Sequence, residues 1–427
     1  MTALSESIKK MSGYKLHLVK TDKYKTNTLV WKMKAPLQAT DVTKRAILPY
    51  VLQSSTKKYP TTAKLRSYLD ELYGATLFVD LAKKGEYHVI TLSIEIANEK
   101  FLGDQTPLLK HAFELLTEIL LNPNATNHSF DAATIEMEKR TLKQRIQSVY
   151  DDKMRYSNLR LIQEMCSGEP YALNVNGELE SVNQINAENL FEYYQQALAE
   201  DELDLYIIGD IDEDEVYKTA SDLIKFQDRT PKEAKKISVR TKDKVNEVIE
   251  KQDVKQGKLN IGYRTNVVYG DPDYYALQLF NGIFGGFSHS KLFRNVREKA
   301  SLAYYAASRL ESHKGLMMVM SGIDSKNYQQ AVQIINEQMQ AMKNGDFTDE
   351  EIDQTKAVIR NQLLETIDTS RGIVEVLYHN VVSKQPIDLQ TWFEGMEQVT
   401  REDIVKVAQK IEADTIYFLT GTEGGSQ

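Results

Sequence analysis

The chain has 427 residues, which is too long for one ordinary hydrophobic core, so we expect two or more domains. Hydrophobic residues make up 41% and charged residues 27% of the sequence, which is typical of a globular protein, and no uninterrupted apolar stretch reaches the ~18–20 residues that a membrane span needs. The net charge of -8 argues against a broad nucleic-acid-binding surface, because such a surface needs excess Lys and Arg to neutralise phosphates.

The N-terminal segment from Met1 to Lys20 is polar and carries several lysines. It lacks the apolar core segment of a secretory signal, so we do not expect export. The single cysteine, Cys166, excludes an internal disulfide and fits a reducing compartment. We therefore predict a cytoplasmic location.

Local patterns predict both strands and helices. The period-two alternation of His88, Ile90, Leu92, Ile94 and Ile96 with more polar residues predicts a strand with one apolar face. Farther along, helical spacing predicts a helix after Pro107 that ends before Pro123. Its apolar positions are Leu109, Ala112, Phe113, Leu116, Ile119 and Leu120.

A polar, charged stretch separates the two halves of the chain. Residues 229–236 contain a proline and little apolar surface, so their composition favours a linker. We place this linker at residues 229–248, between an N-terminal domain at residues 1–228 and a C-terminal domain at residues 249–427. In the second domain, Thr348 and Glu351 have the spacing of a capping box at the start of a helix.

The two halves share an internal repeat. The matched segments are residues 64–75 with 291–304, 130–142 with 347–359, 184–188 with 398–402, and 205–209 with 416–421. Any single match is within reach of chance, but matches in the same order at a nearly constant offset indicate a duplication. Because strands and helices do not alternate strictly, we expect an α+β fold, with two homologous sandwich domains that each place helices on one side of an antiparallel sheet.

The second half contains a long signature. Residues 285–299 read Gly-Gly-Phe-Ser-His-Ser-Lys-Leu-Phe-Arg-Asn-Val-Arg-Glu-Lys, and Leu302-Ala303-Tyr304 follow. This run resembles the C-terminal signature of the pitrilysin/insulinase metallopeptidases, which include the mitochondrial processing peptidases. In the first half, residues 56–60 and 72–75 resemble the segments downstream of the zinc helix of that family. The resemblance implies the two-domain fold of a processing-peptidase subunit.

The zinc site of that family is degenerate in this sequence. Active members carry His-x-x-Glu-His, in which two histidines bind zinc and the glutamate is the general base, with a distant glutamate as third ligand. The resemblance places the motif at residues 46–50, where Ala46 and Tyr50 replace the histidines and Pro49 replaces the base. It places the third ligand at Arg145, whose cation would repel zinc. Proline also disrupts a helix interior, so we expect altered local geometry.

The spacing of the histidines agrees with a degenerate zinc site. The histidines are His17, His88, His111, His128, His289, His313 and His379. No two of them lie three to five residues apart, so no helix carries a two-histidine zinc grip. We expect no cofactor in this chain. Assembly of a site from histidines distant in sequence stays open, although structural roles are more common.

A second functional element of the family is retained. The resemblance assigns to Arg297 and Tyr304 the Arg and Tyr that hold the substrate backbone, since both side chains donate hydrogen bonds to a carbonyl oxygen or oxyanion. Gly285 and Gly286 would line the path of the peptide. The alternative is that Arg297 pairs with a local carboxylate such as Glu298 and that Tyr304 only packs. The resemblance also places peptide, added as an extra edge strand, at residues 86–96.

Three functions follow from these observations. The first is an enzymatically inactive subunit that binds peptide and contributes Arg297 and Tyr304 to a chamber shared with a zinc-bearing homologue, as a heterodimer that processes peptides. The second is a peptide-binding or scaffold protein without hydrolysis, alone or as a homodimer. The third is a peptidase with an unrecognised site, for which Cys166 is the only thiol. We expect no activity from the chain alone and zinc only in the partner.

Overall fold

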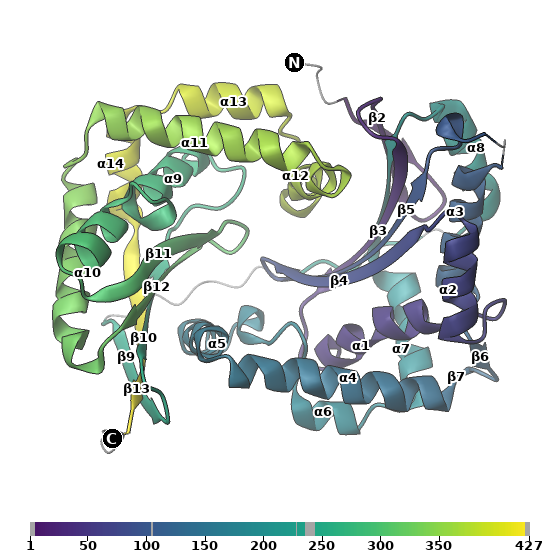
Figure 1. Ribbon diagram of the computed structural model, residues 1–427, viewed down its shortest axis with the longest axis horizontal. Helices are drawn as coiled ribbons and strands as arrows, with labels where there is room; N and C mark the ends of the chain where they lie inside the picture. Colours follow the sequence, from purple (N-terminus) through teal and green to yellow (C-terminus); the bar gives the residue numbers. More distant parts are fainter. Residues whose placement is uncertain (1–4, 104–105, 228, 235–243, 423–427) are drawn as a thin grey trace. The chain divides into compact units, whose positions relative to one another are not determined.

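The computed structural model describes residues 5–103, 106–227, 229–234 and 244–422. The chain forms two compact units, each of which contains one large mixed β-sheet and a set of helices (Figure 1). The N-terminal unit comprises residues 1–147 and 173–236, and the C-terminal unit comprises residues 148–172 and 237–427. The α+β fold class predicted from the sequence is therefore confirmed.

The N-terminal unit is built on a six-stranded sheet in the order β1-β2-β8-β3-β5-β4. Its strands are β1 Ser7–Lys10, β2 Lys15–Lys20, β3 Thr26–Pro36, β4 Thr76–Lys84, β5 Tyr87–Ala97 and β8 Glu202–Gly209, with a separate small hairpin of β6 Ala125–Thr126 and β7 Ser129–Phe130. Its helices are α1 Val42–Ser54, α2 Thr62–Glu71, η1 Glu99–Phe101, α3 Leu108–Leu121, α4 Ala132–Asp151, α6 Leu179–Asn183, α7 Ala187–Glu200 and α8 Glu213–Leu223. All pairs in the large sheet are antiparallel except β2 with β8, which is parallel.

One face of this sheet forms the core with the helices. The predicted strand is β5, and its Ile90, Leu92 and Ile94 are fully buried among apolar side chains of α1 and α3. The predicted helix at residues 108–121 is α3, which follows Pro107 as expected. One prediction about β5 was wrong: it is not an edge strand, because it pairs with β3 on one side and β4 on the other. The edge of the sheet is β4.

The C-terminal unit has a five-stranded sheet in the order β11-β12-β10-β13-β9. Its strands are β9 Asn246–Gln252, β10 Gly257–Arg264, β11 Ala303–Glu311, β12 Leu316–Ile323 and β13 Glu412–Gly421. Its helices are α5 Lys153–Met165, η2 Pro170–Ala172, α9 Tyr274–Asn281, the π-helices η3 Gly282–Gly286 and η4 Phe293–Lys299, η5 Ser325–Asn327, α10 Tyr328–Lys343, α11 Asp349–Ile367, α12 Ser370–Ser383, α13 Leu389–Glu397 and α14 Arg401–Lys410. Only the pair β9 and β13 is parallel.

The topology of the two sheets supports the duplication inferred from the sequence. The order β2-β8-β3-β5-β4 in one unit corresponds to β9-β13-β10-β12-β11 in the other, and the single parallel pair lies at the same place in both. The matched sequence segments fall on equivalent elements, such as the starts of α4 and α11 and of α7 and α14. The capping box of Thr348 and Glu351 is present at the start of α11.

In the C-terminal unit, helices cover a second face of the sheet in addition to the one expected from the sequence. On one face, β10, β12 and β13 bury Ile261, Val319 and Phe418 against the later helices. On the other face, the same strands bury Met318 and Leu419 against α5. The strand β12 reads Leu-Met-Met-Val-Met-Ser-Gly-Ile, an apolar run typical of a strand that is covered on both faces.

The compact units do not follow the order of the chain, because α5 and η2 come from the first half of the sequence and pack in the C-terminal unit. The predicted domain boundaries at residues 228 and 249 differ from the limits of the compact units, and whether residues 1–228 and 249–427 fold independently stays a prediction. In the predicted linker, residues 229–234 are described, residues 235–243 lie outside the described residues, and β9 begins at Asn246. Arg229 and Lys232 bind the N-terminal unit through the carbonyl of Gly13 and the carboxylate of Glu200.

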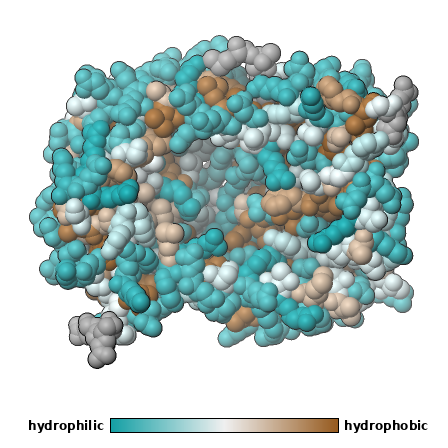
Figure 2. Space-filling view, viewed as in Figure 1, coloured by the Kyte–Doolittle hydropathy of each residue, from teal (hydrophilic) through white to brown (hydrophobic). Residues whose placement is uncertain are grey.

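The surface carries mixed polar and apolar side chains. Figure 2 shows a largely hydrophilic face on which apolar side chains form separate patches. Among the helices that the structure describes, none combines the length and apolar character required to cross a membrane.

Candidate functional site

The residues that the resemblance assigns to the zinc site lie in the N-terminal unit, on α1 and α4. The structure brings two of the predicted positions together: the guanidinium carbon of Arg145 lies 3.6 Å from the centroid of the Tyr50 ring. This distance is that of a stacked cation–π contact. Helix α4 presents Arg145 to α1 because its Ile135, Leu142 and Ile146 are buried and set the rotation of the helix.

The electrostatics of this pair follow from burial. Burial lowers the pKa of the Arg145 guanidinium from its ordinary value, and Tyr50 and Glu138 oppose that lowering. Burial also raises the pKa of the Tyr50 hydroxyl, while the charge of Arg145 acts against the rise. An arginine stays protonated at neutral pH even with a lowered pKa. The position that the resemblance assigns to the third zinc ligand therefore carries a positive charge.

The residues at this position do not fit zinc. A methyl group, a pyrrolidine ring, a phenol and a guanidinium replace the ligands and the base at Ala46, Pro49, Tyr50 and Arg145. The nearby carboxylate of Glu138 accepts a hydrogen bond from the Ser54 hydroxyl at 2.9 Å. Within the described ranges of the chain, no group of at least three His, Cys, Asp or Glu side chains is arranged to hold a metal ion.

The expected disruption of the helix at Pro49 was wrong. Helix α1 runs without a break from Val42 to Ser54, with Pro49 inside it and buried. Proline removes the hydrogen bond to the carbonyl four residues earlier, at a cost of about 3 kcal/mol. Leu48 and Leu52 of the same helix are almost fully buried. Tertiary packing therefore stabilises the helical conformation at Pro49.

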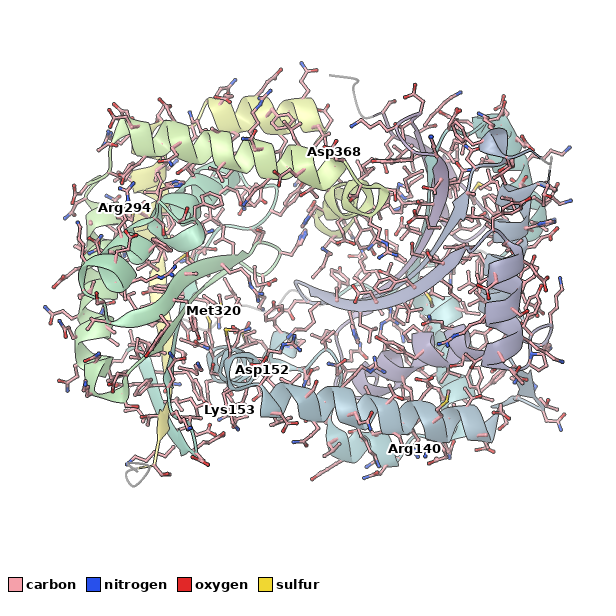
Figure 3. All side chains as sticks on the ribbon, in the orientation of Figure 1. Arg140, Asp152, Lys153, Arg294, Met320 and Asp368 are labelled. Atoms are coloured by element: carbon pink, nitrogen blue, oxygen red, sulfur yellow. The ribbon has the colours of Figure 1, made fainter. Side chains whose placement is uncertain are left out.

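Arg297 lies in the C-terminal unit, in the π-helix η4, and its side chain is exposed. Its guanidinium carbon lies 4.6 Å from the centroid of the Phe293 ring, which supports one face of the cation and leaves its N–H groups available. The same helix is anchored by Arg294, labelled in Figure 3, whose guanidinium pairs with the Glu351 carboxylate at 2.7 Å. A π-helix is a common feature of functional sites.

Tyr304 lies at the start of β11, which is an edge strand of the sheet. The pairing with β12 shifts register between Ala303 and Tyr305, so Tyr304 is the extra residue of a β-bulge. Bulges redirect side chains and are frequent beside active sites. Tyr304 is 76% exposed, so its side chain is not held by packing in a core.

The predicted glycines lie in and beside the same region. A Cβ atom at Gly285 would lie 2.8 Å from the backbone nitrogen of Ser308 in β11, so close approach of two backbones requires glycine there. A Cβ atom at Gly286 would lie 2.9 Å from the Asn281 side chain. Packing therefore explains Gly285, and contact of either glycine with peptide stays a prediction.

Two histidines distant in sequence meet in the C-terminal unit. His313 Nε2 lies 2.7 Å from His379 Nδ1, and both rings pack on Tyr269. Sequence spacing gives no signal for this pair, because the residues come from the β11–β12 turn and from α12. His289 instead contacts the Thr355 hydroxyl at 2.9 Å.

Cys166 is fully buried between α5 and the sheet, so its thiol is not accessible to a substrate.

The chain is similar in sequence and in structure to known proteins. Residues 184–359 match the family model described as the peptidase M16 inactive domain. The chain is 58% identical over 426 residues, covering the whole of both chains, to a Bacillus subtilis protein named probable inactive metalloprotease YmfF. It is 34% identical to a conserved protein from Enterococcus faecalis of known crystal structure, with a TM-score of 0.90 over 99% of this chain and 100% of that one. A more distant relative, 23% identical over 65% of this chain and 69% of its own length, is the Bacillus subtilis antilisterial bacteriocin subtilosin biosynthesis protein AlbE.

Proposed function

The chain belongs to the M16, or pitrilysin, family of metallopeptidases, and from this membership we propose that it is a non-catalytic subunit that binds peptide beside a zinc-bearing homologue. In this proposal, a heterodimeric partner supplies zinc and the general base. Arg297 and Tyr304 of this chain complete the shared chamber. The similarity to a protein named for bacteriocin biosynthesis supports peptide maturation as the process.

One contrast carries the proposal. The zinc positions hold a stacked Arg145 and Tyr50, whereas Tyr304 is exposed on a bulge and Arg297 is exposed on a π-helix. A guanidinium and a phenol can donate hydrogen bonds to the carbonyl oxygen that becomes an oxyanion when water attacks it. Loss of the metal ligands together with exposure of the oxyanion donors supports a division of work between two chains.

Peptide binding is supported by the free edges of the sheets. In each unit, one side of the sheet ends at an equivalent strand, β4 in the N-terminal unit and β11 in the C-terminal unit. An extended peptide can add to such an edge through its backbone, which gives affinity with little demand on sequence. On β4, Phe78 is 42% exposed and can contact alternate side chains of the peptide.

The test is reconstitution with a zinc-bearing homologue that carries His-x-x-Glu-His, with turnover of quenched-fluorescent peptides as the readout. We expect a stable complex whose turnover falls by about 10²–10³ for Arg297→Ala or Tyr304→Phe, since each removes one oxyanion donor. Arg309→Ala is the matched control, because Arg309 is an exposed arginine on β11, the strand that carries Tyr304. Unchanged turnover by both variants in an intact complex would refute a role in trans.

The free edges also suit a second candidate, a peptide-binding protein that acts without a partner. It predicts that the isolated chain binds peptides in calorimetry and that no zinc-bearing homologue co-purifies with it. The proposal above predicts co-purification. In either case, the single cysteine supports a reducing compartment such as the cytoplasm.

A further inference from the structure

The open side of β9 distinguishes the two sheets at otherwise equivalent places. In the N-terminal unit, β2 is covered by β1, which pairs with it antiparallel over residues 7–10 and 15–18. The equivalent strand of the C-terminal unit is β9, and in the part of the chain that the structure describes no strand lies beyond it (Figure 1). An exposed edge strand is a template for pairing with another chain.

The hydrogen bonding of β9 shows which backbone groups face this open edge. The carbonyl of Gln252 accepts a hydrogen bond from the backbone of Thr422, so the backbone groups of Gln252 point toward β13. Backbone groups alternate in direction along a strand. The N–H and C=O groups of Glu247, Ile249 and Lys251 therefore point toward the open edge.

The side chains of the same residues are the exposed ones of the strand, and Ile249 is 53% exposed. They form a self-complementary pattern, with Glu247 two residues before Ile249 and Lys251 two residues after it. If two copies of β9 pair antiparallel with Ile249 at the centre, each Glu247 lies opposite a Lys251. Opposite charges in directly facing pairs stabilise an antiparallel sheet, and like charges destabilise it.

A groove beside the strand gives room for the second copy. It lies between β9 and α10, has a volume of about 670 Å³, and has Val332 and Ile416 among its lining residues. Tyr328 lines it as well, stacked on Phe418 of β13, with its hydroxyl donating to the Glu247 carboxylate. In the antiparallel register above, Lys251 of the partner subunit lies opposite Glu247, which lines this groove.

We propose that a second copy of this chain docks on β9, related by a two-fold axis through Ile249, and joins the two five-stranded sheets into one. Backbone hydrogen bonds form from Glu247, Ile249 and Lys251 to the partner subunit, and two Glu247–Lys251 pairs flank the central isoleucines. Such an isologous contact uses the same patch on both copies and closes on itself. It lies on a different strand from Arg297 and Tyr304, so it is compatible with the proposed function and does not depend on it.

The test is a charge exchange measured by analytical ultracentrifugation of the full chain from about 1 μM to about 1 mM. Glu247→Lys places lysines opposite each other, and Lys251→Glu places glutamates opposite each other. We expect each variant alone to dimerise at least about tenfold more weakly than the wild type. An equimolar mixture of the two variants restores the opposite-charge pairs, so it should dimerise as strongly as the wild type. Lys110→Glu, an exposed lysine on α3, is the control for net charge.

A second variant tests the backbone contact. Ile249→Pro removes an N–H that faces the open edge and is not used within the sheet, so the fold should persist while dimerisation is lost. A wild-type chain that stays monomeric up to the highest concentration would overturn the proposal. So would single charge variants that dimerise normally, or a mixture that fails to restore the dimer.

Discussion

The two units have the same sheet topology and differ in the chemistry they retain. At the positions that the resemblance assigns to zinc ligands in the N-terminal unit, a half-buried Arg145 stacks on a half-buried Tyr50. At the proposed peptide-facing region of the C-terminal unit, Tyr304 is exposed on a bulge and Arg297 on a π-helix. The N-terminal unit keeps this topology with no group of His, Cys, Asp or Glu side chains among its described residues that could hold a metal ion, and its core consists of apolar side chains.

The two units also differ at the other side of each sheet, at the equivalent strands β2 and β9. In the N-terminal unit, His17 of β2 lies beside Tyr206 and bonds to Glu6 and Asp204. At the equivalent position of the C-terminal unit, Val248 of β9 lies opposite Tyr417. In the N-terminal unit, polar side chains anchor β1 beside β2, whereas among the described residues no strand pairs with the outer side of β9.

The largest expected effect comes from introducing the zinc ligands of the family into the N-terminal unit. Ala46→His, Pro49→Glu, Tyr50→His and Arg145→Glu together should give a chain that holds about one zinc ion. Structural zinc sites bind with roughly 10–16 kcal/mol at pH 7, so the ion should survive dialysis. Zinc analysis by mass spectrometry is the measurement. The same chain with Arg145 retained is the control, and equal zinc in both would show that Arg145 does not occupy the ligand position.

A buried ion network should make the C-terminal unit sensitive to one arginine. The Arg264 guanidinium bonds to Glu169 at 2.7 Å and to Asp414 at 3.0 Å, and all three side chains are buried. Arg264→Ala leaves those carboxylates without that partner and should cost about 3–5 kcal/mol. Hydrogen exchange should report the loss in β10 and β13 and not in the N-terminal sheet. The exposed Arg309→Ala should cost less than about 1 kcal/mol, and a similar small loss at Arg264 would contradict this account.

The pH dependence of stability should differ between the units. Burial disfavours the charged form of His17, but its bonds to Asp204 and Glu6 outweigh this, so its pKa is raised above the ordinary value of 6.5. The imidazolium therefore stabilises the N-terminal unit fully below about pH 6.5, and this contribution is lost as the pH rises through the raised pKa. The expected loss is about 1 kcal/mol.

Urea unfolding of the wild type and of His17→Gln across this pH range is the measurement. The variant should lack the dependence, and an equal pH slope in both proteins would show that His17 is not its source.

The smallest expected effect tests the duplication itself. Equivalent helices α7 and α14 begin with capping boxes, at Asn186 and Thr400. Asn186→Ala and Thr400→Ala should each cost about 1 kcal/mol. Denaturation of both variants should give losses that agree within about 0.5 kcal/mol. A much larger loss in one unit would mean that the two caps no longer have the same role.

Local sequence patterns predicted the secondary-structure elements that depend mainly on neighbouring residues. Alternation located β5, helical spacing located α3, and the Thr348 capping box located the start of α11. Ordered sequence matches anticipated two sheets of the same topology. The resemblance also paired Tyr50 with Arg145 as positions of one site, and the structure places the two side chains in contact.

The features that could not be predicted from the sequence depend on contacts between residues far apart in the chain. Whether β5 or β4 forms the edge depends on which strands pair, and alternation within a strand carries no information on this. The place of α5 on the second face of the C-terminal sheet, and the contact between His313 and His379, also join residues far apart in the chain. At Pro49, tertiary packing outweighed the local tendency of proline to break a helix, so the prediction from this local signal was wrong.

We propose that the N-terminal unit holds no zinc, and the decisive measurement is the zinc content of the purified wild-type chain. After dialysis against micromolar zinc and removal of the excess, the account predicts a stoichiometry near zero. One tightly held zinc ion per chain would contradict it, and would mean that other side chains of this protein form a metal site.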